Sequence, residues 1–229
     1  NATLMPSQRQ LFLEHIGQTS HAPLMIEIER AEGSFLYDSQ GRDYLDLISG
    51  VSVSNTGHRH PAVMAALKEQ ADRYMHLMVY GEIIQSPQVQ YATRLASLLP
   101  QSLESVYFVN SGSEAIEGAL KLARRYTGRS EIIYFRNAYH GSTTGALSVQ
   151  GSEVYRNAFR PLMPSTVMAE FNSPAAVEMI GCNTAAVIVE PVQAEAGVIQ
   201  PSGYFLNELR EACSRNGALL IFDEVQTGF

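Results

Sequence analysis

The sequence predicts an α/β fold in which a mostly parallel sheet carries helices on both faces. Three apolar runs, residues 132–135, 185–189 and 218–222, show no alternation of polar and apolar side chains. Such runs are typical of strands that are covered on both faces. Amphipathic segments separate the runs, and strands that are joined through helices usually pair in parallel. We therefore expect a three-layer arrangement of helix, sheet and helix.

A helix and a small antiparallel meander are expected ahead of this sheet. Residues 7–15 place apolar side chains at helical spacing, and Pro23 forces a break soon afterwards. Between residues 26 and 47, short apolar runs are separated by glycine turns, which is the pattern of short paired strands.

Composition and periodicity change after the meander. Residues 47–61 have the composition of a loop, and a helical period resumes over residues 62–75. We therefore divide the chain into an N-terminal segment, 1–57, and the N-terminal part of a large domain, 58–229.

The large domain is expected to alternate between helices and strands. Apolar spacing, glycine and proline mark the ends of each element. The predicted order is a helix at 89–99, a strand at 106–109, a helix from Glu114, strands at 132–135 and 185–189, a helix at 205–213 and a central strand at 218–222.

Charge and cysteine usage exclude several classes of function. The net charge is −7 with no basic stripe, so nucleic acid is not an expected partner. Cys182 and Cys213 form no C-x-x-C pattern, which favours reduced thiols and a cytoplasmic location. No apolar run approaches the ~20 residues of a membrane span, and the N-terminus lacks a signal-peptide pattern.

The stretch YFVNSGSEAIEGALKLARR, residues 107–125, has the order strand, glycine turn, helix. Unpaired N–H groups and the helix dipole can hold a phosphate on Gly112 and Ser113. A capping box formed by Ser111 and Glu114 explains the same residues without any ligand. The residues alone leave both interpretations open.

Two further stretches carry candidate site residues. Tyr139 and His140 follow a predicted strand, where an aromatic ring can stack on a planar heterocycle or simply pack in the core. Asp223 and Glu224 follow the last predicted strand, at the end of the sheet where open α/β folds bind ligands. Because neighbouring side chains point to opposite sides, only one of these carboxylates can face a pocket.

Five stretches resemble class III aminotransferases, which are fold type I enzymes dependent on pyridoxal phosphate. The matching stretches are GVSVSNTGHRHPAV, SGSEAIEGALKLARRYTGR, FRNAYHGSTTG, EPVQAEAG and DEVQTGF. They occur in the order and context of the family between residue 50 and residue 229. The resemblance implies pyridoxal 5′-phosphate as cofactor and a homodimer with the active site at its interface.

The resemblance also implies a role for each matched residue. Ser111, Gly112 and Ser113 would hold the phosphate, and Tyr139 with His140 would lie against the cofactor ring. In the DEVQTGF motif, Asp223 would bond the pyridine nitrogen, Val225 would pack on the ring face and Gln226 would bond the ring hydroxyl.

Two residues would face the substrate. By the match, Val51 would line the substrate pocket and Glu195 would face the substrate side chain or pair with an arginine. A buried valine and a solvated loop carboxylate are the alternatives for these two residues. No metal is expected, because His58 and His60 lie in a turn without a nearby cysteine or carboxylate cluster in the sequence.

The chain departs from the family pattern at two places. The ornithine, acetylornithine and 4-aminobutyrate branches usually carry arginine after His-Gly, where this chain has Ser142, so those three donors are not expected. The only lysines are Lys68 and Lys121, and neither is placed to form the Schiff base with the cofactor. In the family that lysine follows DEVQTGF, so we expect the sequence to be the N-terminal part of a longer enzyme.

The predicted function is transfer of an amino group from a small-molecule donor to a keto acid. Decarboxylases and aminomutases of the same family share these motifs and remain alternatives. A lysine-free module without catalytic activity is a third. A nicotinamide-binding domain is disfavoured because no G-x-G-x-x-G follows a predicted strand.

Overall fold

The computed structural model describes residues 6–78 and 81–228, which form two compact units divided between Gln90 and Tyr91. Each unit is described by itself. The division lies further along the chain than the boundary drawn from the sequence. The assignment of 1–57 and 58–229 as domains stays a prediction.

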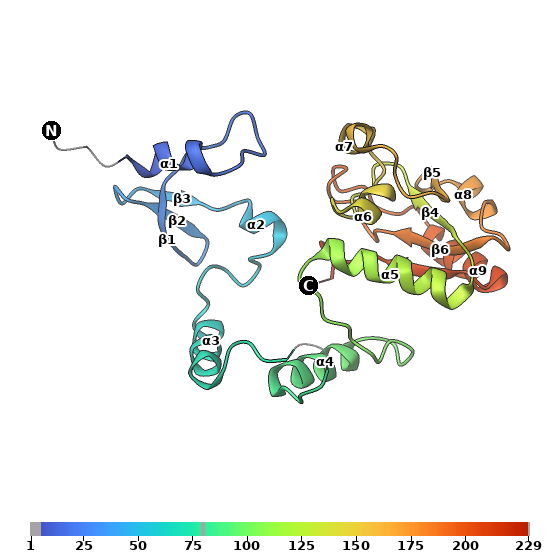
Figure 1. Cartoon of the computed structure of the whole chain (residues 1–229), viewed down its shortest axis with the longest axis horizontal. Coiled ribbons are helices and arrows are strands. Elements are labelled where there is room, and N and C mark those ends of the chain that lie inside the picture. Colours follow the sequence, from blue (N-terminus) through green and yellow to red (C-terminus); the bar gives the residue numbers. More distant parts are fainter. Residues whose placement is uncertain (1–5, 79–80, 229) are drawn as a thin grey trace. The chain divides into compact units, whose positions relative to one another are not determined.

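The first unit contains the predicted helix and meander (Figure 1). The side chains and backbones of Ser7 and Gln10 form a capping box at the start of the first helix. The three strands pair antiparallel in the order β1-β2-β3. The elements are α1 (Gln8–His15), β1 (Ile28–Glu32), β2 (Phe35–Asp38), β3 (Asp43–Leu45), α2 (Ser49–Ser52), α3 (Pro61–Arg73) and α4 (Ser86–Leu98), whose last residues extend into the second unit.

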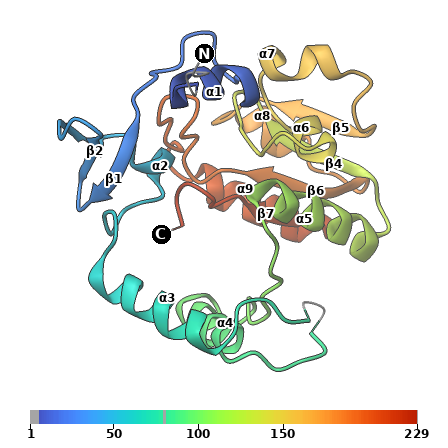
Figure 2. The same ribbon diagram turned by 60° about the vertical axis from the view of Figure 1, so that its left-hand side comes forward.

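The second unit is built on a parallel sheet with the strand order β5-β4-β6-β7 (Figure 2). All six residues of β6 are buried, as the unbroken apolar run predicts. The strands are β4 (Glu131–Phe135), β5 (Thr166–Ala169), β6 (Thr184–Val189) and β7 (Leu219–Phe222).

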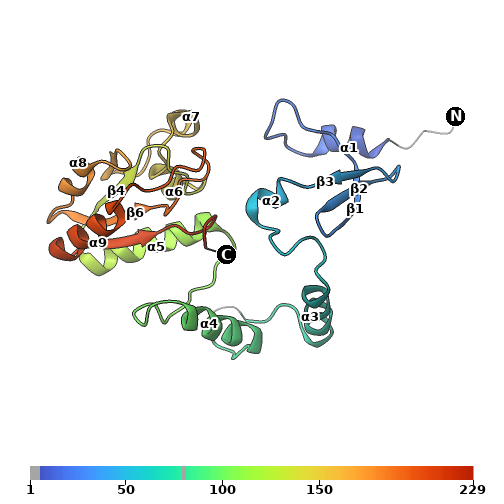
Figure 3. The same cartoon turned by 180° about the vertical axis from the view of Figure 1, so that it is seen from behind.

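Helices cover both faces of this sheet, so the predicted three-layer α/β fold is confirmed. On one face, α5 and α6 pack against a cluster that includes Ile132 and Ile188. On the other face, α8 and α9 pack against Ile133 and Val187 (Figure 3). The helices are α5 (Gly112–Thr127), α6 (Thr144–Ser148), α7 (Glu153–Arg156), α8 (Pro174–Glu178) and α9 (Phe205–Asn216), with a 3-10 turn at Asn157–Phe159.

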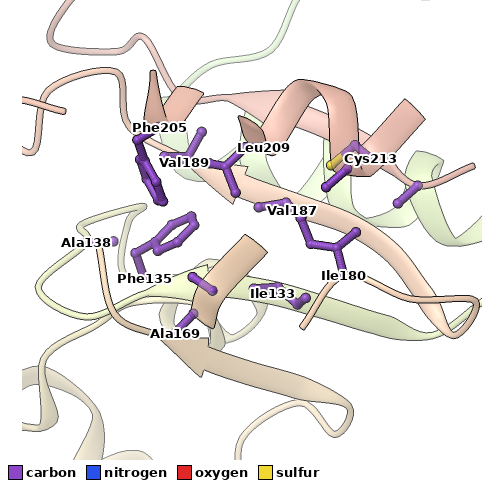
Figure 4. Packing of buried hydrophobic residues seen from close by; sticks show 13 residues of the cluster. Ile133, Phe135, Ala138, Ala169, Ile180, Val187, Val189, Phe205, Leu209 and Cys213 are labelled. Carbon is purple, nitrogen blue, oxygen red and sulfur yellow. The ribbon is translucent and has the colours of Figure 1, made fainter. Parts of the chain in front are cut away.

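Aromatic rings fill one end of the core on the α9 face. Phe135 meets Phe171 and Phe205 edge to face, with ring centroids 5.8 and 5.7 Å apart. Phe205 begins α9 and packs beside Leu209 and Val189 (Figure 4). Edge-to-face aromatic pairs have a preferred geometry in addition to the apolar area that they bury. This cluster therefore fixes the end of β4 just before the loop that carries Tyr139.

One prediction about the strands is wrong. Residues 106–109 form no strand in the described chain, and the side chain of Tyr107 is 83% exposed. An apolar run becomes a strand only where a partner supplies backbone hydrogen bonds, and no described strand pairs with it. The strand predicted over 218–222 is β7, which pairs only with β6 among the described strands; its central position in the sheet of the longer protein stays a prediction.

The short elements between residues 144 and 178 were not predicted. They are α6, α7, α8 and β5, each of four or five residues. Windows of this length carry too little periodicity to be recognised. Within residues 6–78 and 81–228, no helix has the length and apolar character needed to cross a membrane.

Two leucines on α5 provide a matched test of this packing. Leu120 is 2% exposed in the core, whereas Leu122 on the same helix is 64% exposed. Leu120→Ala should lower the free energy of unfolding by about 2–5 kcal/mol, because it leaves a cavity between helix and sheet. Leu122→Ala should change it by less than about 0.5 kcal/mol. Denaturant unfolding measures both, and equal losses would contradict the orientation of α5.

Candidate active site

The carboxyl ends of the parallel strands open onto a pocket of about 200 Å³ in the second unit. The loop after β4 supplies Tyr139 and His140, the loop after β6 supplies Glu190, and the segment after β7 supplies Asp223. All predicted cofactor residues line it, namely Ser111, Gly112, Ser113, Tyr139, His140, Asp223, Val225 and Gln226, together with Gly141, Glu190, Val192, Glu195 and Thr227. Ligands of open α/β sheets bind at this end of the strands.

The start of α5 forms one wall of the pocket. The Ser111 hydroxyl accepts a hydrogen bond from the Glu114 N–H at 3.2 Å, so the capping interpretation is correct for this serine. Glu114 reaches back to the Asn110 N–H at 2.7 Å, one residue before the cap. Gly112 and Ser113 occupy the first turn of a helix of 16 residues, where backbone donors point outward and the dipole favours an anion. Capping and anion binding are therefore compatible at this helix.

Two glycines allow the pocket walls to approach one another. A Cβ at Gly112 would lie 3.0 Å from Cγ2 of Val225, and a Cβ at Gly141 would overlap the Ser113 side chain. Gly141 also has a φ of +118°, which favours glycine. The Ser142 N–H donates to Oγ of Ser113 at 3.3 Å. The His-Gly step of the loop is thus held directly against the start of α5.

Glu117 is a positioning residue that the sequence did not reveal. Its Oε1 accepts hydrogen bonds from the Thr143 hydroxyl at 2.7 Å, from the Gly145 N–H at 2.8 Å and from the Ala146 N–H at 3.2 Å. Lys121, four residues further along α5, forms no ion pair with Glu117 among the described residues and does not line the pocket. Glu117 instead fixes the end of the loop that contains His140.

Asp223 forms the most buried polar contact of the pocket. His140 Nδ1 lies 2.7 Å from Oδ2 of Asp223, and both side chains are almost fully buried. Since a carboxylate can only accept, the ring nitrogen donates this bond. The other oxygen, Oδ1, accepts from the Val225 N–H at 3.1 Å. Glu224 is exposed and does not line the pocket, as the alternation along an extended chain predicts.

Glu190 brings a second buried carboxyl group to the same pocket. Its side chain accepts a hydrogen bond from the Tyr139 N–H at 3.1 Å, which holds the loop after β4. The pKa of Glu190 is raised to about 7, chiefly by burial and also by the nearby charges of Asp223 and Glu195, against the lowering effect of the Tyr139 N–H. This proton-binding group was not among the predicted site residues. The sequence feature that could have revealed Glu190 is its place directly after the apolar residues of β6, at the end of the sheet where ligands bind.

Gln226, predicted to bond the cofactor's ring hydroxyl, and Glu195, predicted to face the substrate, are in contact with each other. Gln226 Nε2 donates to Glu195 Oε1 at 2.9 Å. Val51 belongs to the other compact unit, where it lies in α2 with a φ of +61° and 55% of its surface exposed. Its role at the substrate therefore stays a prediction.

The histidines considered for zinc lie in the first unit. His58 Nε2 is 2.7 Å from Oδ2 of Asp46, so this histidine has a carboxylate partner that its sequence neighbours did not suggest. Hydrogen bonding from His58 lowers the pKa of Asp46. Groups of three or more histidine, cysteine, aspartate or glutamate side chains able to hold a metal do not occur among the residues that the structure describes.

Comparison with known proteins identifies relatives along almost the whole chain. Residues 16–229 match the family described as Aminotransferase class-III. The acetylornithine aminotransferase of Methanopyrus kandleri is 44% identical over 217 residues, which are 93% of this chain and 54% of that protein. The chain thus spans about half the length of the curated relatives it matches.

Solved structures show the same similarity. The adenosylmethionine-8-amino-7-oxononanoate aminotransferase of Methanocaldococcus jannaschii has a TM-score of 0.89 at 30% identity, over 96% of this chain and 55% of that chain. An ornithine aminotransferase from Toxoplasma gondii, with partial occupancy of PLP at its active site, has a TM-score of 0.81 at 31% identity, over 95% and 52%.

The raised pKa of Glu190 predicts an unusual pH dependence of stability. The unfolded chain ionises this group near 4.5 and the folded chain near 7, so folding stability should fall as the pH rises through that window. Glu190→Gln lacks this ionisation. Between pH 4 and pH 8, the cofactor-free wild type should lose as much as roughly 3 kcal/mol more than the variant. Urea unfolding at both pH values measures the difference. Equal losses of unfolding free energy in the wild type and in Glu190→Gln would show that Glu190 titrates normally.

Proposed function

Because the chain belongs to the class III aminotransferase family, we propose that the whole protein is an aminotransferase dependent on pyridoxal 5′-phosphate. It moves an amino group from a small-molecule donor to a keto acid. The observation that carries the proposal is that the first turn of α5, which suits an anion, and the buried Asp223–His140 pair line the same pocket.

The residues of the pocket fit this cofactor. A phosphate suits the first turn of α5, where Ser111, Gly112 and Ser113 line the pocket and glycine leaves room for a close approach. An aromatic side chain, Tyr139, and an aliphatic one, Val225, line the same space and suit the faces of a planar ring. The buried Nε2 of His140 has no partner among the described residues, so this ring nitrogen, next to Asp223, is available for a hydrogen bond to a ligand.

We infer separate tasks for the polar residues of the chain. Pyridoxal phosphate supplies an electron sink that stabilises negative charge on the substrate carbon. Asp223 holds a proton on the ring nitrogen, because a buried carboxylate favours a positive charge beside it. His140 fixes the orientation of that carboxylate through its Nδ1 bond. Gln226 binds the ring hydroxyl, and Glu195 and Val51 face the substrate.

The donor is inferred from the loop after His140. The relative from Methanopyrus kandleri is named for acetylornithine, but Ser142 stands where the ornithine, acetylornithine and 4-aminobutyrate branches usually carry an arginine for the substrate carboxylate. We therefore propose that the protein prefers donors other than acetylornithine, ornithine and 4-aminobutyrate. A donor screen with pyruvate and 2-oxoglutarate as acceptors tests this, and efficient use of any of the three would overturn it.

We also propose that the protein is a cytoplasmic homodimer. The resemblance of residues 50–63 to a segment that crosses the dimer interface in the family supports the dimer. Val51 and Val53 in this segment are exposed apolar side chains, available to a second copy of the chain. The two cysteines are unpaired, which supports a reducing compartment.

Asp223 and Glu224 provide an internal comparison for the proposed function. In the whole protein loaded with cofactor, Asp223→Asn keeps the shape of the side chain but cannot stabilise a positive charge on the ring nitrogen. We expect kcat to fall by about 10² or more, at least ~2.7 kcal/mol of barrier. Glu224→Gln should stay within about tenfold, a change below ~1.4 kcal/mol, since Glu224 is exposed outside the pocket.

Stopped-flow measurement of the first half-reaction separates the two variants. Normal turnover of Asp223→Asn together with an inactive Glu224→Gln would mean that the other carboxylate anchors the cofactor.

A further inference from the structure

A second cavity, of about 240 Å³, adjoins the active-site pocket in the same compact unit. Tyr139 lines both cavities, so each of them borders this side chain. The rings of Tyr139 and Tyr155 stand nearly perpendicular, with centroids 6.0 Å apart. Leu147 and Phe159 add further apolar surface. A space with such walls suits an aromatic or branched aliphatic group.

Gln150, which also lines this cavity, carries a carboxamide without a partner. The residue is 1% exposed, and neither Oε1 nor Nε2 has a hydrogen-bond partner among the described residues. Buried amides in folded proteins are nearly always bonded, because leaving them unpaired costs stability. A ligand group with its own donor or acceptor would remove this cost.

The charges around the two cavities differ in a way that fixes the orientation of a ligand. Glu190, Glu195 and Asp223 line the active-site pocket, whereas no charged side chain lines the second cavity. The guanidinium of Arg156 lies nearby but does not line the second cavity. Its NH1 donates to the Gln150 carbonyl at 3.0 Å and to the Tyr134 hydroxyl and lies 3.8 Å from Oε1 of Glu153, whereas its buried Nε has no partner among the described residues. An ammonium group is therefore favoured in the first cavity and an uncharged group in the second.

We propose that the second cavity binds the uncharged end of the substrate, an apolar group that carries a carboxamide, hydroxyl or carbonyl recognised by Gln150. The proposal rests on the proposed function for the orientation of the amine. The cavity and the unpaired amide are independent of it. Gln150 thereby determines specificity: it favours a neutral polar end over a carboxylate, for which the cavity offers no cation.

The test measures binding without turnover. Phenylacetamide has no amine to transfer and matches the cavity in having an aromatic ring and a neutral amide, whereas phenylacetate has nearly the same shape and a charge. In titration calorimetry with the whole cofactor-loaded protein, we expect phenylacetamide to bind at least tenfold more tightly than phenylacetate. This comparison needs no variant, so it holds even if substitutions impair folding.

Gln150→Leu is the matched variant, because leucine fills similar space without hydrogen-bonding atoms. We expect it to weaken phenylacetamide binding at least fivefold without lowering the melting temperature, since an unpaired amide is removed. Val154→Ala is the control, because Val154 is exposed on α7 and does not line the cavity. It should leave binding unchanged.

Equal binding of amide and acid by the wild type, or unchanged amide binding by Gln150→Leu, would overturn the subsite. Failure of the proposed function looks different. If both binding results hold but no amine is transferred to any keto acid, the subsite stands and the assigned reaction is wrong. If transfer occurs and the binding results fail, the reaction stands and the subsite is wrong.

Discussion

The hydrogen bond between His140 and Asp223 is the contact on which the arrangement of the pocket depends. It joins the loop after β4 to the segment after β7, two strands that are separated by β6 in the sheet. Both side chains are buried, and a carboxylate in such a place is stable only while its hydrogen bonds are complete. This one bond therefore fixes both the orientation of the Asp223 carboxylate and the position of the loop that carries His140. Tyr139, at the preceding position, is held in turn by its N–H bond to Glu190.

Helix α5 supplies the second constraint on the same loop. Ser113 contacts Gly141 and Ser142 at the start of the helix, and Glu117 binds the loop one turn later. A helix whose buried face is anchored in the core by Ile116 and Leu120 is a rigid reference for these contacts. The first turn of α5 and the aromatic side chain of Tyr139 are thus held in place by contacts with one helix, as preorganised binding of a cofactor requires.

The sequence was sufficient to predict the layers of the fold because β4 and β6, in the middle of the sheet, are buried on both faces. β4, β6 and β7 fall within a residue of the predicted runs, and α5 and α9 follow from amphipathic spacing. The prediction of a strand at 106–109 was wrong because an apolar run does not reveal whether a partner strand is present. Most site residues were predicted from local motifs, each at the end of a strand or the start of a helix. The bonds His140–Asp223, Glu117–Gly145 and Gln226–Glu195 join residues 28 to 83 positions apart, so no local pattern could contain them.

The most direct test is a crystal structure of the whole protein with pyridoxal 5′-phosphate. The arrangement described above predicts the phosphate group on the N–H groups of Gly112 and Ser113, with Asp223 within hydrogen-bond distance of the ring nitrogen and still bonded to His140. A phosphate bound away from the start of α5, or a ring nitrogen that faces a residue other than Asp223, would contradict it.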